Sequence, residues 1–490
     1  MKNHSTVSRR DFMKAIGLGT ATLGAAGVVA HDLDEILSVG SDIDTDRKHR
    51  WWVKEKDEPT VEVDWTLQTR WHGAQTGQCT YWQRQYLTQD ELDRRSAAST
   101  EFTNNARKAD KGSFRVKDYA LGSCQTAASS QASNWGVVRR PTGTLQCNNA
   151  NATGKYQGTP EENSRLIRNV LRIFGAGDVG FGMLDQQKKD KFVLSHLKEG
   201  GNSSTTWLPP LTTCRRIDFD NTATIGYEET ERIVLPGATQ LYDAAFTIPM
   251  VKQGFRAGGQ LKGFSNSSRY RHFTSLQLQL QWFIAHIGYY MYGYPTTMGG
   301  LVPSQGAGML TGICENGRNS GYSITPEFGT INGFFSLVTD LPLASTRPID
   351  AGIWRFCQTC KKCVENCPFD CIPDGEPTWE PMINGKPDLC HSPGRKQTWQ
   401  NGPQCWTSTG LIGGCGNCMG ACTFNTDGAS VHDVVRATLA TTSLFNGFLW
   451  RADKFFGYGM YEDPNKFWDI NFPTWGFDTT FGNVSGRYGK

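Results

Sequence analysis

The chain has 490 residues, of which 20% are charged, and a formal net charge of +3. All of this net charge lies in residues 1–30, where four basic residues face one acidic residue. The neutral remainder gives no indication of nucleic-acid binding. The length is enough for two or three domains around a large buried core.

The N-terminus carries a pair of arginines followed by a short apolar run. Arg9 and Arg10 precede small and apolar residues from Ala15 to Ala30. This order is typical of a twin-arginine export signal, and the run is too short for a stable membrane span of about 20 residues. We therefore predict a signal over residues 1–30 that is cleaved near His31. A cytosolic chain with a chance arginine pair is the alternative.

Residues 31–155 mix short apolar pieces with polar stretches. Arg50–Val53 and Val61–Trp65 are predicted to be extended. From Leu121 to Gly154 the chain is rich in Ser, Ala, Asn, Gly and Thr, a composition that favours a loop.

A helix is predicted to begin after Thr159, with Pro and Glu at its first and third positions and apolar residues at helical spacing as far as Phe174. Gly175 then opens a G-x-G-x-x-G pattern. A dinucleotide fingerprint requires a strand before this pattern and a helix after it, and here the order is reversed. We therefore expect Gly175 to end the helix and Val179–Leu184 to form a strand.

Further along, we predict an extended segment at Phe246–Val251 and a helix at Leu276–Tyr290 that ends near Gly288. Residues 293–323 hold eight glycines and few charges. Such a segment lets the backbone approach a flat, bulky ligand, although a flexible surface would have the same composition. Val431–Leu449 is predicted to form one long helix, and the aromatic tail beyond it a strap over the core.

Two cysteine runs lie between these helices. The first has the spacing C-x2-C-x2-C-x3-C-P, which is the bacterial run for an iron–sulfur cluster; it comprises Cys357, Cys360, Cys363 and Cys367. The second keeps the C-x2-C-x3-C spacing behind a displaced first cysteine; it comprises Cys405, Cys415, Cys418 and Cys422. In two-cluster proteins the fourth cysteine of each run ligates the other cluster. We therefore predict two [4Fe–4S] clusters, one held by Cys357, Cys360, Cys363 and Cys422, the other by Cys367, Cys405, Cys415 and Cys418.

Zinc and disulfides are the alternatives for these cysteines. A structural zinc site needs only two C-x2-C pairs, whereas this pattern offers two triplets and two exchanged fourth ligands. A three-residue spacing repeated in this way is a poor disulfide framework. The export signal agrees with clusters, because the twin-arginine route carries folded proteins and a preassembled cluster needs a folded chain.

With the signal and the cysteine runs in place, the chain resembles the catalytic subunits of respiratory reductive dehalogenases over nearly its whole length. The segments that carry the resemblance, besides the signal and the first cysteine run, are Gly158–Glu162, Phe283–Tyr290, Ile324–Gly329, Thr339–Leu343, Pro348–Gly352 and Phe445–Phe448. The resemblance implies an α+β fold in which a nitroreductase-like α/β core binds a corrinoid, base-off, beside a ferredoxin-like domain with two [4Fe–4S] clusters. The absence of a D-x-H-x-x-G segment agrees with a corrinoid that takes no histidine ligand from such a motif.

The resemblance also implies a division of the chain. Its parts are a signal peptide (1–30), an N-terminal region covering the corrinoid (31–155), the corrinoid-binding domain (156–351), the cluster domain (352–428), and a C-terminal helix and tail (429–490).

Site residues follow from the same resemblance. The family's proton donor is a tyrosine eighteen residues before the glycine of the G-Y-Y segment, which gives Tyr270. Some members place a basic residue beside this tyrosine, but the corresponding position here is Gly333, so Arg318 is considered as a substitute. Thr296 and Trp406 are the candidate substrate-pocket residues.

The implied function is the replacement of a halogen of an organohalide by hydrogen. Chlorinated ethenes are the expected substrates and chlorinated aromatics the alternative. The implied partners are a small membrane anchor protein and an upstream electron donor of the respiratory chain, with the enzyme on the outer face of the cytoplasmic membrane. No nucleic-acid partner is expected. Two other functions stay open: a corrinoid enzyme similar to epoxyqueuosine reductase, against which the export signal argues, and an exported two-cluster electron-transfer protein without a substrate.

Overall fold

The computed structural model describes residues 41–42, 47–50, 52–115, 117–119, 155–198, 214–295, 299–425 and 430–472. The predicted signal, the predicted loop from 121 to 154 and the candidate Thr296 lie outside these residues.

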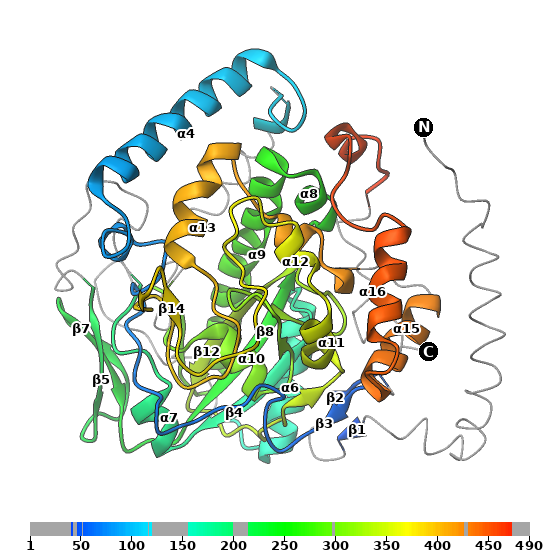
Figure 1. The fold of residues 1–490 in the computed structure, drawn as a ribbon. Coiled ribbons are helices and arrows are strands. Elements are labelled where there is room, and N and C mark those ends of the chain that lie inside the picture. The colour runs from blue at the N-terminus through cyan, green and yellow to red at the C-terminus, as the bar shows by residue number, and fades with distance from the viewer. Residues whose placement is uncertain are drawn as a thin grey trace, which may run out of the picture.

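A four-stranded sheet lies at the centre of the fold, with the strand order β4-β8-β12-β9 and antiparallel neighbours (Figure 1). The strands are β4 (Val179–Leu184), β8 (Leu241–Pro249), β12 (Asn332–Thr339) and β9 (Met291–Tyr292). Nearly every residue of β8 and β12 is buried, because both faces of the sheet are covered. The predicted strands at 179–184 and 246–251 are therefore confirmed, the second beginning five residues earlier than expected.

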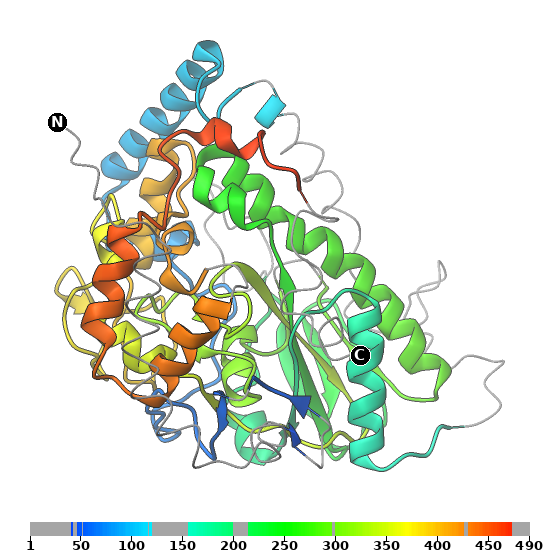
Figure 2. The same cartoon turned by 90° about the vertical axis from the view of Figure 1, so that its right-hand side faces the viewer.

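Alternation along β8 divides its side chains between two cores. Phe246 and Ile248 pack with α6 (Pro160–Ile173) and α9 (Gly259–His286), which lie side by side along one face of the sheet (Figure 2). Ala245 points to the other face, where α10 (Ser304–Leu310) packs. A three-stranded sheet completes that second core; its strands are β5 (Arg216–Asp220), β7 (Arg232–Pro236) and β6 (Tyr227–Glu228).

The helix α6 begins and ends as predicted. The Thr159 hydroxyl accepts a hydrogen bond from the Glu162 amide while the Glu162 carboxylate accepts one from the Thr159 amide, a full capping box. Gly175 follows the helix with a φ of +96°, in the region that favours glycine. The rejection of a dinucleotide fingerprint is thereby supported, since this glycine ends a helix.

The helix α9 corrects the prediction of a helix at Leu276–Tyr290. It begins at Gly259, seventeen residues earlier, and runs to His286, with Gly288 just beyond it at a φ of +88°. Its first half is polar because it lines a cavity, so no apolar periodicity marks it in the sequence. Tyr270 consequently lies in the middle of a long helix.

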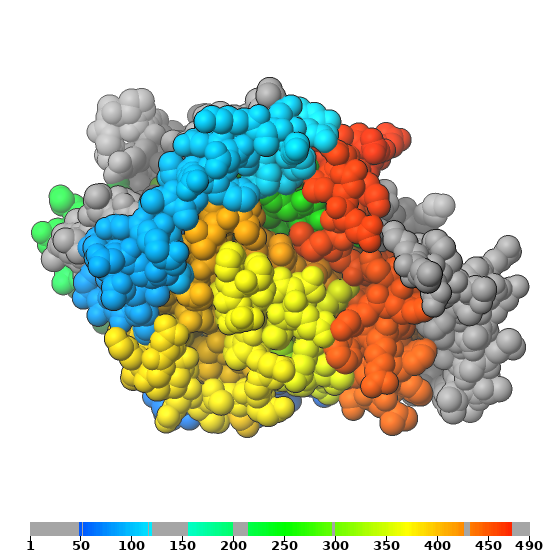
Figure 3. All heavy atoms as spheres, turned by 45° about the horizontal axis from the view of Figure 1, so that its top comes forward, coloured from blue at the N-terminus to red at the C-terminus, as the bar shows by residue number. Residues whose placement is uncertain are grey.

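The cysteine-rich segment is built from short helices that stand over one end of the sheet (Figure 1). They are α11 (Ile353–Thr359), α12 (Lys362–Glu365), α13 (Gly402–Ser408) and α14 (Asn417–Gly420), with 3-10 turns η2 (Thr409–Ile412) and η3 (Thr423–Asn425). The buried Glu315 carboxylate accepts hydrogen bonds from the backbone amides of Ala351, Ile353 and Trp354 and so caps the start of α11. The helix α4 (Gln89–Ala109) lies across α13 and η2 (Figure 3).

The C-terminal part corrects the prediction of one helix at Val431–Leu449. Two helices are present, α15 (Ser430–Thr441) and α16 (Asn446–Phe455), separated by a short turn. Arg50 joins this part to the sheet domain, because its guanidinium pairs with Glu327 at 2.9 Å and Asp433 at 3.4 Å. Phe467 of the tail packs with Leu261 of α9, which agrees with the predicted strap.

The N-terminal predictions were partly wrong. Strand β3 is Lys54–Glu55, just after the predicted segment, and it pairs with β13 (Ile349–Asp350). Val61–Trp65 forms no strand and makes only an isolated bridge between Val63 and Arg395. No helix among the described residues is long and apolar enough to cross a membrane.

Candidate active site and metal centres

A cavity of about 640 Å³ lies where α9, β12, the glycine-rich segment after β9, the cysteine-rich segment and residues 59–78 meet. Its described lining contains no Asp or Glu, but it contains five cations: Lys191, Lys198, Lys262, Arg269 and Arg395. Burial lowers the pKa of Lys198 to about 8 and that of Arg395 to about 10. A cavity with this charge distribution favours an anionic or strongly polar ligand.

Tyr270 lines this cavity and has a cation beside it. The Arg269 guanidinium donates a hydrogen bond of 2.9 Å to the Tyr270 hydroxyl, and its central carbon lies 4.6 Å from the centroid of the tyrosine ring. The tyrosine ring packs edge-on against Phe335 of β12, with 6.1 Å between ring centroids. The side chain is thus fixed on one side by β12 and on the other by its neighbour in the helix.

Gly333 explains how Arg269 reaches this position. A Cβ atom added at Gly333 would lie 2.4 Å from the Arg269 Cδ atom, well inside contact distance. A larger residue at position 333 would displace the arginine from the tyrosine. The alternative partner, Arg318, lies elsewhere: its guanidinium donates to the carbonyls of Cys357, Gln358, Pro373 and Gly375.

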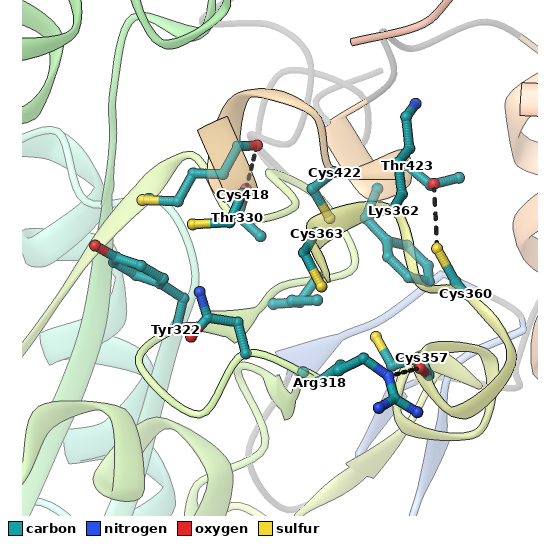
Figure 4. Close-up of a pocket in the computed structure, with 15 residues that line it drawn as sticks. Arg318, Tyr322, Thr330, Cys357, Cys360, Lys362, Cys363, Cys418, Cys422 and Thr423 are labelled. Atoms are coloured by element: carbon teal, nitrogen blue, oxygen red, sulfur yellow. Dashed lines mark hydrogen bonds between the residues drawn. The ribbon is translucent and has the colours of Figure 1, made fainter. Parts of the chain in front are cut away.

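A second cavity is enclosed by the first cysteine group, defined as Cys357, Cys360, Cys363 and Cys422. Their sulfur atoms surround one space in Figure 4, and all four residues line the same cavity together with Arg318 and Lys362. Cys422 follows α14, in the second run of the sequence, yet it lies with the cysteines of the first run. The structure therefore brings together the four residues assigned to one cluster, and their role as its ligands stays a prediction.

The second cysteine group is Cys367, Cys405, Cys415 and Cys418. Three of its members line the large cavity: Cys405, Cys415 and Cys418. Cys367 completes the group, because its thiol lies within electrostatic range of all three others. Cys418 lines both cavities, so the two cysteine groups are neighbours and only the second is open to Tyr270.

Comparisons with known proteins give the family. The family model described as "Reductive dehalogenase subunit" matches residues 48–343. This protein belongs to the reductive dehalogenase family. The chloroethene reductive dehalogenase of Dehalococcoides mccartyi (strain VS) is 27% identical over 97% of this chain and 99% of the relative. The trichloroethene reductive dehalogenase of Dehalococcoides mccartyi (strain ATCC BAA-2266 / KCTC 15142 / 195) is 27% identical over 95% of this chain and 96% of the relative.

A solved structure supports the fold of this reductive dehalogenase. The structure of the catabolic reductive dehalogenase NpRdhA superimposes with a TM-score of 0.54 at 16% sequence identity and covers 83% of this chain. This chain spans about half the length of that protein, 49%. The predicted family, the class of enzyme that acts on carbon–halogen bonds and the mixed helix-and-sheet fold are thereby confirmed.

Burial opposes the ionisation of thiols in the first cysteine group of the dehalogenase. Burial raises the pKa of Cys363 to about 12 and raises the pKa values of Cys357 and Cys422 as well. In the second group, a hydrogen bond from Cys371 lowers the pKa of Cys367 to about 5. Iron makes a coordinating thiol a thiolate, so four thiols around one space fit a metal cluster better than a protein core.

The geometry also argues against zinc in this dehalogenase. Among the described residues, no group of three or more His, Cys, Asp or Glu side chains is close enough together to hold a single metal ion. A mononuclear site needs Zn–S distances of about 2.3 Å, whereas a four-iron cluster separates its thiolates around a larger body.

The substrate-pocket predictions can be placed only in part. Trp406 lies on α13, lines the cavity of the dehalogenase and is 47% exposed; its role in substrate binding stays a prediction. Thr296 lies outside the described residues. Asn266, which the sequence argument missed, lines the same cavity one helical turn before Tyr270.

One face of α9 supplies four polar groups of the site. Lys262, Asn266 and Tyr270 line the cavity at intervals of four residues, and Arg269, which also lines it, follows Asn266 by three. Such intervals bring side chains to one face of a helix. The helical spacing of these polar residues was therefore present in the sequence, but it could be recognised only once the helix was known to begin at Gly259.

Proposed function

We propose that this enzyme replaces a chlorine of a chlorinated ethene by hydrogen, using a corrinoid and two [4Fe–4S] clusters. The carbon–halogen bond takes up two electrons and a proton, so that the carbon gains hydrogen and the halogen leaves as halide. The observation that carries the proposal is the Tyr270 hydroxyl, held by Arg269 in a cavity that also contains three cysteines of the second group. The names of the two Dehalococcoides relatives support a chlorinated ethene as substrate.

The cysteine groups fit the clusters by number, burial and arrangement. Each group offers four thiols, and the fourth comes from the other run, as in two-cluster ferredoxins. Thr423 lies near the thiol of Cys360 at 3.8 Å between Oγ1 and Sγ, a further polar contact at the first group. When bound, the clusters would bring electrons one at a time to the wall of the large cavity.

The large cavity fits a corrinoid by its positive charge and its unpaired polar atoms. Arg269 Nε and Asn332 Oδ1 are buried and have no hydrogen-bond partner among the described residues. The one histidine in the described lining, His391, has protein atoms at both ring nitrogens, from Asp388 and Ser320. This arrangement supports a base-off corrinoid without a histidine ligand from the protein. When bound, the corrinoid would supply the low-valent cobalt that reduces the carbon–halogen bond.

Tyr270 and Arg269 act on the proton. The Tyr270 hydroxyl transfers its proton to the carbon that loses the halide, as a general acid. The Arg269 guanidinium, already hydrogen-bonded to the phenol oxygen, stabilises the phenolate that this transfer leaves. Water then returns the proton. Trp406 and Asn266 stand where they can contact the substrate.

The same proposal covers the finer fold and the cellular place of the enzyme. Its core is nitroreductase-like and its cysteine domain ferredoxin-like, with the domain limits given above.

The enzyme is exported by the twin-arginine route and held at the outer face of the membrane by a small anchor protein, where a respiratory donor reduces it. The double variant Arg9→Lys with Arg10→Lys should stay in the cytoplasm, unprocessed, in a fractionation experiment.

A turnover assay with purified, cofactor-loaded enzyme and a reduced viologen tests the function. We expect halide release from chlorinated ethenes, and a 10²–10⁴-fold lower rate for Tyr270→Phe at unchanged iron and corrinoid content. Tyr227→Phe, at a half-buried tyrosine on β6 outside the cavity lining, is the matched control and should keep the wild-type rate. Turnover of chlorinated aromatics alone would change the proposed substrate class. A protein that contains iron but binds no corrinoid and turns over no organohalide would instead be an electron carrier.

A further inference from the structure

Lys262 stands between the second cysteine group and the proton-donating pair. It is half-buried on α9 and lines the large cavity with Cys405, Cys415 and Cys418. Its stem lies against Gly416, where an added Cβ atom would come within 2.8 Å of Lys262 Cγ and 3.0 Å of Cε. The lysine is therefore packed onto the loop that joins two of the four cysteines.

The titratable groups near Lys262 are unusual for a lysine in such a place. They are the thiols of Cys415, Cys418 and Cys405 and one cation, the guanidinium of Arg269; burial lowers the pKa of Lys262. Among the described residues no carboxylate pairs with its ammonium, and no hydrogen bond of the ammonium is found. A half-buried cation next to another cation is costly unless an anion lies near it.

The lysine beside the first cysteine group has a different environment. Lys362 lies in the wall of the first cavity, but its ammonium pairs with the buried Asp453 carboxylate and donates to the Tyr458 carbonyl. Its charge is thus compensated by the protein. Lys262 lacks such a partner, and the nearest groups that can become negative are the three cysteines.

We propose that Lys262 is the counter-charge of the second iron–sulfur cluster and raises its reduction potential. The inference rests on the proposed function, in which the second cysteine group holds that cluster. Four thiolates make the bound cluster anionic, and uptake of one electron adds one negative charge. Lys262 therefore stabilises the reduced form more than the oxidised form, and net charge near a cluster is one of the quantities that set its potential.

In this role, Lys262 would also hold the electron of the second cluster close to the proton donor Tyr270. Lys262 and Tyr270 are eight residues apart on one helix, a rise of about 12 Å. Lys262 and Tyr270 line the same cavity, so reduction of the second cluster would add its negative charge beside that cavity. No atom would be transferred: the first cluster would lose the one electron that the second gains.

An EPR-monitored redox titration of the purified, cofactor-loaded enzyme tests the inference. In Lys262→Met we expect the equilibrium constant for reduction of one cluster to fall about tenfold, a shift of about 59 mV to lower potential. The other cluster, the iron content and the corrinoid content should stay unchanged. Lys262→Arg keeps the charge and should keep the potential. Gly416→Ala keeps the lysine but displaces its stem, and should shift the same cluster in the same direction.

Lys361→Met is the matched control, because Lys361 is next to Cys360 in sequence but half exposed and paired with Asp374. It should leave the potential of the second cluster unchanged. Unchanged potentials in a fully loaded Lys262→Met enzyme would overturn the inference, as would an equal shift of both clusters. Loss of corrinoid at unchanged potentials would assign Lys262 to cofactor binding instead. A wild-type enzyme with iron for only one cluster would contradict the proposed function rather than the role of Lys262.

Discussion

The two cysteine groups use the same ligands in different surroundings. The first group is enclosed, and both of its neighbouring cations are fixed: Arg318 by four backbone carbonyls and Lys362 by Asp453. The second group opens onto the cavity that holds Tyr270, and its neighbouring cation Lys262 has no carboxylate partner among the described residues.

In the proposed function, this difference separates the tasks of two clusters. Fixed charges in a closed cavity suit a cluster that only relays electrons, because its surroundings change little between the two redox states. An open cavity with a less constrained cation suits the cluster that delivers electrons to the reaction. The sequence motifs are nearly alike, so the distinction arises from the elements that pack against them.

The largest effect should follow from removing the exchanged ligand. Cys422→Ser should lose the cluster of the first group, about four of about eight irons, because Cys422 lies with Cys357 and Cys360 in the enclosed cavity. Iron analysis and EPR of the purified variant measure this loss. Cys314→Ser, a buried cysteine in the core of the sheet domain, should keep all the iron. Loss of the cluster facing the large cavity would show that the fourth ligands are not exchanged.

A smaller effect is expected from breaking the ion pair beside the first group. Lys362→Met leaves the Asp453 carboxylate buried, where burial already raises its pKa, and should lower the free energy of unfolding by about 3–5 kcal/mol. Urea unfolding of the loaded protein measures the change. Lys361→Met removes an exposed pair with Asp374 and should cost less than about 1 kcal/mol. Equal effects of the two variants would mean that the buried pair does not stabilise the fold.

Several parts of this site could be predicted from the sequence because they depend on local signals. Cysteine spacing, the capping box at Thr159 and the strand at Val179–Leu184 need only neighbouring residues. Arg269 could not be assigned, because its role depends on the empty space above Gly333 on a distant strand. Lys262 was missed for a related reason: a polar helix face looks like a surface until the cavity opposite it is known.

The carboxylate that caps the start of α11, the helix of Cys357, predicts a pH dependence of stability. Burial raises the pKa of Glu315 from 4.5 to about 6. The folded state therefore holds its proton more tightly than the unfolded state, so this contribution to stability is present at low pH and is lost as the pH rises from about 4.5 to 6. The loss should be about 2 kcal/mol.

Urea unfolding of the loaded protein at several pH values measures this dependence. The Glu315→Gln variant cannot ionise, so the difference in unfolding free energy between it and the wild type should change over that pH range. A constant difference would show that Glu315 does not titrate between the two states.

The smallest effect is expected at Cys371, and it tests how the second group chooses its ligands. The Cys371 amide donates a hydrogen bond of 3.2 Å to the Cys367 sulfur, and the Cys371 thiol lies within hydrogen-bonding range of Cys367 and Cys405. Five thiols therefore meet where four are needed. The cysteine spacing assigns Cys367 as the ligand, and the amide of Cys371 then supports that ligand by a hydrogen bond to sulfur. The backbone makes this contact, so a side-chain substitution should leave it intact.

We expect Cys371→Ser to keep all the iron and Cys367→Ser to lose the second cluster, as measured by iron content and EPR. Loss of iron in Cys371→Ser together with retention in Cys367→Ser would exchange the two assignments, and the first run would then contribute a cysteine outside its motif.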